Sequence, residues 1–148
     1  MTKNDDAVEV RAQGWRRLAA LHGLIESALE KELQAAHRLS VVEYTVLDAL
    51  NRQDDGWHMR MQQLSRAAAL SSSATTRLVG RLEDRGLLAR FLCVDDRRGI
   101  YTELTPAGQR LLEDARPTHD RVLAESLARA AEVPELESLA ASLERQRA

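Results

Sequence analysis

Hydroxyl and guanidinium side chains are concentrated between residues 71 and 81 of the 148-residue chain. The polar residues of this segment that could contact a ligand are Ser71, Ser72, Ser73, Thr75, Thr76, Arg77 and Arg81. Serine and threonine hydroxyls can bond to bases or to phosphates, and a guanidinium can bind O6 and N7 of guanine together. Such side chains on one helix favour recognition of double-stranded DNA over catalysis.

The same segment has the spacing of an amphipathic helix. Ala74, Leu78 and Leu82 lie four residues apart and form one apolar stripe with Val79. Either Ser71 or Ser72 can cap the helix by accepting a hydrogen bond from an unpaired backbone N–H, and Gly86 suits the left-handed conformation that closes a helix. We therefore predict a helix over about residues 73–85, with the positive end of its dipole toward phosphate.

Shorter elements on both sides complete a winged helix-turn-helix. A short helix is predicted over residues 61–68, and the connection 69–71 is as short as a helix-turn-helix requires. Two strands are predicted over residues 87–94 and 100–104, because β-branched and aromatic residues flank a turn that contains Gly99. This hairpin is the wing, and the fold class is mainly α with a small β-hairpin wing (α+β).

Two helices are predicted before the short one. The first covers residues 15–36, where apolar residues recur at helical spacing, and residues 1–8 are predicted to be disordered. The second opens at a capping box, in which Ser40 and Glu43 exchange hydrogen bonds, and it ends near Asn51.

Further helices are predicted after the wing. Thr105 can cap a long helix whose first turn contains Pro106. Pro117 lies within the apolar pattern of this helix and should kink it, and Pro134 should open a last helix. Residues 57–59 are expected to add a short strand beside the wing.

These elements suggest two regions. We assign residues 37–104 to a winged helix-turn-helix domain that binds DNA. Residues 9–36 and 105–148 form a helical dimerisation region, since these helices are too apolar for the periphery of a monomer. Two-fold pairing would place two recognition helices about one DNA turn (~34 Å) apart, which suits a palindrome. The alternative is that these helices merely cover the winged domain.

Charge is unevenly distributed along the chain. The formal net charge is −2, but residues 57–110 contain nine arginines and five carboxylates, so that the rest of the chain is acidic. A basic segment on an acidic body is compatible with DNA binding, because only the contacting face must meet phosphate. The single cysteine, and the lack of an apolar run near the roughly 18 residues of a membrane span, predict a cytoplasmic protein.

Three motifs lie between residues 64 and 108. They are the run LSSSATTRLVGRLEDRGLL at 70–88, the wing tip Asp96-Arg97-Arg98, and LTPAG at 104–108. With these motifs the chain resembles the MarR family of bacterial transcriptional regulators. The resemblance implies that the recognition helix enters the major groove and that a wing arginine enters the adjacent minor groove. In this sequence Arg98 would be that arginine, and Asp96 would orient it.

Two positions depart from the family pattern. Ala69 stands where a glycine is common in the turn, and Arg60 stands where a serine or threonine helix cap is expected.

Specific contacts are predicted for the polar residues. Those at the major groove are Ser72, Ser73, Thr75, Thr76 and Arg77, with Arg81 toward phosphate and Arg97 on the backbone. Ser71 is a further candidate DNA contact. The alternatives are an ordinary solvated helix face and a polar hairpin turn in which Asp96 and Arg98 pair on the surface. Arg85 and Arg90 are weaker candidates, each binding a phosphate or a surface carboxylate.

The family resemblance also implies a small aromatic or phenolic effector. Its candidate contacts are Trp15, His22 and Tyr44, beside Arg16 and Arg17, and the alternative is that these residues pack at a helix interface. Cys93 is a candidate redox switch, but a small hydrophobic residue is the favoured interpretation, because no second cysteine could resolve a sulfenic acid. The histidines lack metal-ligand spacing.

These features predict a sequence-specific transcriptional regulator of double-stranded DNA. We expect a repressor that acts as a homodimer on a palindromic operator and is released by a small-molecule effector. The alternative is a winged-helix dimer that serves as a protein-interaction module without specific DNA binding. Because the chain has no phosphate-cradling glycine loop, nucleophile elbow or zinc motif, we expect no enzymatic activity, no cofactor and no metal, and no membrane partner.

Overall fold

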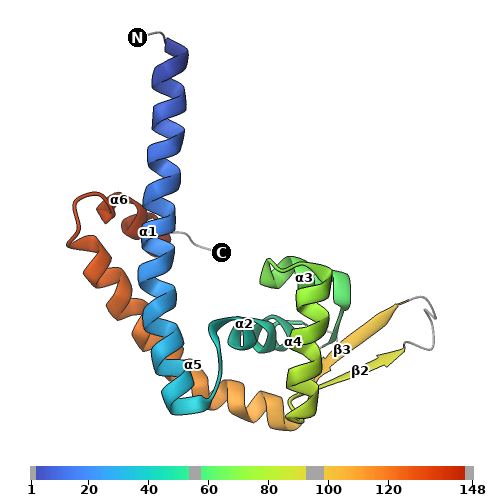
Figure 1. Ribbon diagram of the computed structural model, residues 1–148. Coiled ribbons are helices and arrows are strands. Elements are labelled where there is room, and N and C mark those ends of the chain that lie inside the picture. Colours follow the sequence, from blue (N-terminus) through green and yellow to red (C-terminus); the bar gives the residue numbers. More distant parts are fainter. Residues whose placement is uncertain (1–2, 54–57, 93–98, 146–148) are drawn as a thin grey trace. The chain divides into compact units, whose positions relative to one another are not determined.

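The structure, a computed structural model, describes residues 3–53, 58–92 and 99–145 (Figure 1). Its elements are α1 (Lys3–His37), α2 (Val41–Asn51), β1 (His58–Arg60), α3 (Met61–Ala68), α4 (Ser72–Asp84), β2 (Leu88–Leu92), β3 (Ile100–Leu104), α5 (Pro106–Ala131) and α6 (Glu137–Arg145). Helices dominate and the strands form an antiparallel sheet, so the predicted fold class is confirmed. None of the helices in these ranges is both long and apolar enough to cross a membrane.

The chain divides into two compact units. One consists of residues 33–117 and contains α2, α3, α4, the sheet and the first part of α5. The other consists of residues 1–32 and 118–148. The division falls within α1, after residue 32, and within α5, which runs as one helix through Pro117.

α2 begins at the capping box that the sequence predicts. The Glu43 N–H donates to Ser40 Oγ at 3.0 Å, and the Ser40 N–H donates to Glu43 Oε1 at 2.9 Å. These bonds satisfy two backbone donors at the start of the helix. The helix then turns Val46, Leu47 and Leu50 into the core of the first unit, where all three are fully buried.

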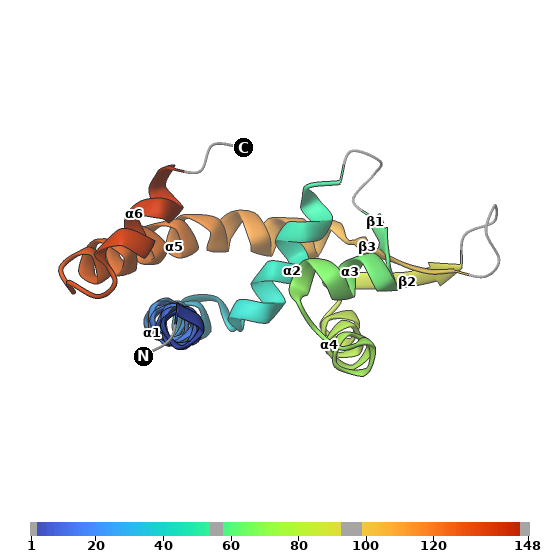
Figure 2. The same cartoon turned by 90° about the horizontal axis from the view of Figure 1, so that it is seen from above.

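β1 joins the wing hairpin as its third strand, in the order β1-β3-β2. Met59 of β1 pairs with Thr102 of β3, and Leu104 of β3 pairs with Leu88 of β2. All four side chains are buried, so this face of the sheet closes the core. Figure 2 shows the hairpin extending from beside α3 and α4, and this burial fixes its base to the helices.

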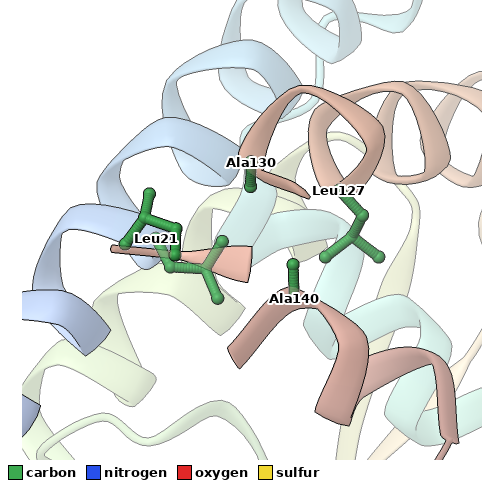
Figure 3. Close-up of a cluster of buried hydrophobic side chains, with 5 residues drawn as sticks. Leu21, Leu127, Ala130 and Ala140 are labelled. Atoms are coloured by element: carbon green, nitrogen blue, oxygen red, sulfur yellow. The ribbon is translucent and has the colours of Figure 1, made fainter. Parts of the chain in front are cut away.

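The second unit has its own apolar core. Leu21 of α1 is buried with Leu127 and Ala130 of α5, and with Leu136 and Ala140 at the last helix (Figure 3). Leu21, Leu127, Ala130 and Ala140 are gathered at one point between the three helices. Because alanine is small, the helix backbones can approach closely there.

The start of α1 corrects one prediction. The helix begins at Lys3, and residues 3–8, which we predicted to be disordered, form its first turns. Asp5 and Asp6 lie in the first turn, where the helix dipole stabilises negative charge. The apolar pattern starts later in the sequence, so the pattern alone did not indicate these turns.

The last helix also begins later than predicted. It starts at Glu137 rather than at Pro134. The preceding residues form turns, in which the Leu136 N–H donates to the Val133 carbonyl at 2.9 Å. This bond spans three residues, so the chain is wound more tightly here than in an α-helix.

Candidate nucleic-acid interface

The turn between α3 and α4 contains a residue in the left-handed conformation. Ala69 has φ 54° and ψ 45°, and the Leu70 N–H donates to the Ser65 carbonyl at 2.9 Å. An L-residue in this conformation costs about 1–2 kcal/mol, which explains why glycine is common at this position. The helix-turn-helix geometry is therefore kept with local backbone strain.

Arg60 occupies the N-cap position of α3, in place of a serine or threonine. An arginine side chain has no acceptor, and Gln63 Oε1 instead accepts a hydrogen bond from the Arg60 N–H at 3.1 Å. Arg60 Nε donates to the Tyr101 hydroxyl at 3.0 Å, and its guanidinium carbon lies 5.5 Å from the ring centre. Arg60 therefore ties the start of α3 to β3.

Ser71, one of the two serines predicted as possible caps, is the N-cap of α4. Its Oγ accepts a hydrogen bond from the Ala74 N–H at 3.2 Å. At the other end the helix ends at Asp84, Arg85 is the C-cap, and Gly86 takes φ 74°. The observed helix differs from the predicted range by one residue at each end.

The two faces of α4 differ in chemistry. Leu78, Val79 and Leu82 are buried in the core. Six of the seven polar residues singled out from the sequence are exposed, namely Ser71, Ser72, Ser73, Thr76, Arg77 and Arg81. The fold therefore brings these hydroxyls and guanidiniums to one surface.

Thr75 lies on the buried face, so the prediction that it contacts the major groove is wrong. Its side chain is fully buried, and its Oγ1 donates to the Ser71 carbonyl at 2.8 Å. Ser65 Oγ donates to the same Oγ1 at 2.9 Å, which links α3 to α4. The signal was present in the sequence, because Thr75 precedes Val79 by four residues and Leu82 by seven, within the apolar stripe.

Thr76 can still accept a hydrogen bond from a ligand. Its Oγ1 donates its proton to the Ser72 carbonyl at 2.9 Å, while the side chain is exposed. The oxygen retains lone pairs. The amino groups of adenine and cytosine in a major groove are donors of the right kind.

Arg85 and Arg90 bind surface carboxylates. Arg85 Nη1 lies 3.2 Å from Glu43 Oε2, and Arg90 Nη2 lies 2.9 Å from Glu83 Oε1. The hydrogen bonds from the Arg90 side chain and backbone N–H lower the pKa of Glu83, and the same pair raises the pKa of Arg90. Of the two predicted partners for these arginines, a phosphate or a surface carboxylate, the structure shows the carboxylate.

Arg77 and Arg81 differ from these two. Among the residues that the structure describes, neither forms an ion pair. Their charges are therefore available to an anion from outside the chain.

The predicted wing tip, Asp96, Arg97 and Arg98, lies outside the described residues, as does Cys93. The described part of the wing ends with Leu92 paired to Ile100 across the hairpin. Both side chains are exposed, at 66% and 51%.

A row of rings crosses the other face of the sheet, which the sequence did not indicate. Phe91 and Tyr101 pair across β2 and β3, and their rings stack with centres 5.8 Å apart. His58 of β1 places its ring edge-on to both, at 6.1 and 5.5 Å. Cross-strand aromatic pairs contribute roughly 0.2–1 kcal/mol each, so this row stiffens the base of the wing. Only the strand register reveals it.

A hollow of about 340 Å³ lies between α3, α4 and the wing. Its polar lining comes from Arg60 and Gln62 at the start of α3, Thr76 of α4 and Arg90 of β2. Thr76 therefore faces the wing side of the recognition helix.

The candidate effector residues belong to different units. Trp15 and His22 lie on α1 in the second unit, where Trp15 is 67% exposed and His22 Nδ1 lies 3.1 Å from Glu26 Oε2. Tyr44 lies on α2 in the first unit and is 4% exposed. Arg16 and Arg17 line a hollow of about 370 Å³ within the second unit.

The fold and this surface define a winged helix-turn-helix protein. A model of the MarR family matches residues 38–99. The HTH-type transcriptional regulator MhqR of Bacillus subtilis (strain 168) is 34% identical over 83 residues, which are 56% of this chain and 55% of that protein. The chain spans a little over half the length of the curated relatives that it matches.

Solved structures resemble more of the chain. Sco3205, a MarR family transcriptional regulator from Streptomyces coelicolor solved in complex with DNA, is 26% identical with a TM-score of 0.75, and the match covers 98% of this chain and 86% of that one. CouR from Rhodococcus jostii RHA1, bound to p-coumaroyl-CoA, is 31% identical with a TM-score of 0.64, over 71% of each chain. The chain belongs to the MarR family.

Proposed function

We propose that this protein is a sequence-specific, double-stranded DNA-binding transcriptional regulator of the cytoplasm, without enzymatic activity. The observation that carries the proposal is the exposed face of α4, where hydroxyls stand beside the guanidiniums of Arg77 and Arg81, which form no ion pair with any residue that the structure describes. The likeness to Sco3205, a protein solved in complex with DNA, supports it.

In this proposal α4 enters the major groove and the wing reaches the adjacent minor groove. Ser72, Ser73 and Thr76 meet base edges, while Ser71 at the helix start lies near the backbone. At the wing tip, Arg98 enters the minor groove, Asp96 orients it, and Arg97 binds the backbone. A positive side chain there favours a narrow, A·T-rich groove.

We further propose that the protein acts as a homodimer on a palindromic operator. Val8, Trp15 and Leu18 of α1 are 53%, 67% and 50% exposed, and Leu143 of α6 is 48% exposed. Apolar surface removed from water stabilises an assembly by roughly 25 cal/mol per Å², so a second copy on these helices is favoured. Residues 37–104 would then bind DNA, and residues 9–36 and 105–148 would pair the two copies.

The regulator would be a repressor that a small aromatic or phenolic effector releases from its operator. The structure of CouR with p-coumaroyl-CoA supports an aromatic ligand for this chain. Trp15, His22 and Tyr44 are the candidate contacts. If they line the effector site, replacing Trp15 or His22 with alanine should change the effector response.

The test is a titration of the purified protein with a duplex that it selects from a random-sequence pool, against a scrambled duplex of equal length. A regulator that makes six to ten phosphate contacts should lose about 10³–10⁵ in affinity between 50 and 200 mM salt. Arg98→Ala should cost about 1–3 kcal/mol of operator affinity and leave the dimer intact. Equal, salt-independent binding to both duplexes would instead favour the protein-interaction module.

A further inference from the structure

A second hollow lies on the flank of α4 opposite the wing. It measures about 300 Å³, and its walls include Ser40 and Val42 at the start of α2, Leu70 of the turn, and Arg77 and Arg81 of α4. At 3.6 residues per turn, these two arginines point roughly 100–140° around the helix from Thr76, which lines the hollow on the wing side. The exposed face of α4 is thus bounded by a hollow on each flank.

The hollow beside α2 carries uncompensated positive charge. In the described part of the chain, no carboxylate pairs with Arg77 or Arg81. Glu43, next to Ser40 in the capping box, is already occupied by the Ser40 N–H and by Arg85 at 3.2 Å. Residues four apart on a helix have Cβ atoms about 5–6 Å apart, so the two guanidiniums repel each other until an anion lies between them.

The remaining walls suit an anion as well. Ser40 Oγ accepts the Glu43 N–H with a lone pair, so its own O–H can turn toward a ligand. Val42 and Leu70 provide an apolar wall, and an apolar surrounding strengthens the attraction between opposite charges. Guanidiniums bind phosphate with two parallel hydrogen bonds. The hollow on the wing side is less positive, because Glu83 neutralises Arg90 there and Arg60 is the one other arginine among the described residues of its lining.

We propose that the hollow beside α2 holds a phosphate group of the DNA backbone, so that Arg77 and Arg81 grip the strand and do not read bases. The inference rests on the proposed function and deepens it. It moves Arg77 from base recognition, where the sequence placed it, to the backbone. Base recognition by α4 then depends on the hydroxyls of Ser72, Ser73 and Thr76.

The experiment compares Arg77→Gln, Arg81→Gln and the two lysine variants with the wild type. Affinity is measured on the selected duplex and on the scrambled duplex, from 50 to 200 mM KCl. Each glutamine variant should weaken both duplexes by the same factor and lower the slope of log K against log[salt] by about 0.9 per half-site. A slope change of about 0.9 means that the contribution of this contact to the affinity differs about eightfold between 0.1 M and 1 M salt. The lysine variants should keep the wild-type slope, since lysine binds phosphate as a point charge.

Arg85→Gln combined with Glu43→Gln is the matched control, because it removes an arginine at the end of the same helix together with the carboxylate that pairs with it, and glutamine can still serve in the capping box. Its slope should stay near that of the wild type. Arg77→Gln could lower the preference for the selected duplex over the scrambled one, and Arg77→Lys could fail to restore it. In that case Arg77 reads a base, and the inference is overturned while the proposed function as a DNA-binding regulator is not. If the wild type selects no duplex, the proposed function fails first, and the phosphate site with it.

Discussion

Replacing Gly80 with alanine should stabilise this protein. Gly80 lies in the interior of α4 (Ser72–Asp84) and does not take a positive φ. A Cβ added there meets no atom within 4 Å beyond its chain neighbours and its own helix backbone. Glycine in a helix interior is about 0.5–1 kcal/mol less favourable than alanine, so Gly80→Ala should raise the free energy of unfolding by about that amount.

Thermal unfolding followed by far-UV circular dichroism measures this change. For a chain of this length a change of 1 kcal/mol shifts the midpoint by about 2–4 °C, so an increase of about 1–4 °C is expected. Denaturant unfolding should give the same sign, with an unchanged m-value. A midpoint below that of the wild type would refute the reasoning.

Gly108→Ala is the matched control, because the same chemical change should have the opposite sign. Gly108 is buried near the start of α5, and an added Cβ would overlap the carbonyl oxygen of Leu87 and lie 2.8 Å from Leu104 Cδ1. That carbonyl is held in place, since it accepts the Thr105 N–H at 3.1 Å. Overpacking of this kind costs about 1–3 kcal/mol.

The same Gly80 variant also probes the proposed DNA interface. Among the residues that the structure describes, nothing requires glycine at this half-buried position, whereas a major groove in close contact with the helix would leave no room for a methyl group. Gly80→Ala should therefore weaken operator binding although it stabilises the fold. A more stable variant with unchanged affinity would contradict the placement of Gly80 against DNA.

Three further predictions concern stability. Thr75→Val should cost about 0.5–1.5 kcal/mol, because the Thr75 hydroxyl bonds to Ser65 and to the Ser71 carbonyl are lost while Ser65 Oγ can still donate to the Met61 carbonyl at 3.0 Å. Calorimetry should show this loss with no separate effect on DNA specificity. Ala69→Gly should raise the free energy of unfolding by about 1 kcal/mol in a urea titration, because glycine adopts φ 54° without strain; a loss would contradict the strain argument. The pKa of Glu83 is lowered by the hydrogen bonds from Arg90, so this pair stabilises the fold above the unfolded pKa of about 4.3 and the effect is lost as pH falls through the folded value. Glu83→Gln should therefore unfold at a lower temperature than the wild type at pH 7 but not at pH 2, and an equal difference at both would refute the pair's role.

Local elements of the fold could be predicted from the chain alone. The capping box of Ser40 and Glu43, the cap at Ser71 and the left-handed Gly86 each depend on hydrogen bonds or backbone angles within about four residues. The helix α3 was predicted with its observed bounds for the same reason. Four-residue spacing of apolar side chains is a property of one helix and needs no partner to be recognised.

The face that each residue presents was harder to predict. Thr75 and Thr76 are the same residue type at adjacent positions, yet one is fully buried and the other exposed. A shift of one residue turns a helix by about 100°, so a small error in the centre of the buried stripe moves a residue from the core to the surface. The hydrogen bond from Ser65 to Thr75 shows which threonine faces the core, and it joins residues that are ten positions apart.

What the sequence by itself determined is therefore the order of the elements, their caps and the chemistry gathered on α4. Only the tertiary structure decided which charges on that surface are free. Arg85 meets Glu43 across 42 positions, and Arg60 meets Tyr101 across 41. Arg77 and Arg81, one or two turns earlier on α4 than Arg85, instead line a hollow. Pairings across such distances depend on how helices and strands pack, and local spacing carries no information about that.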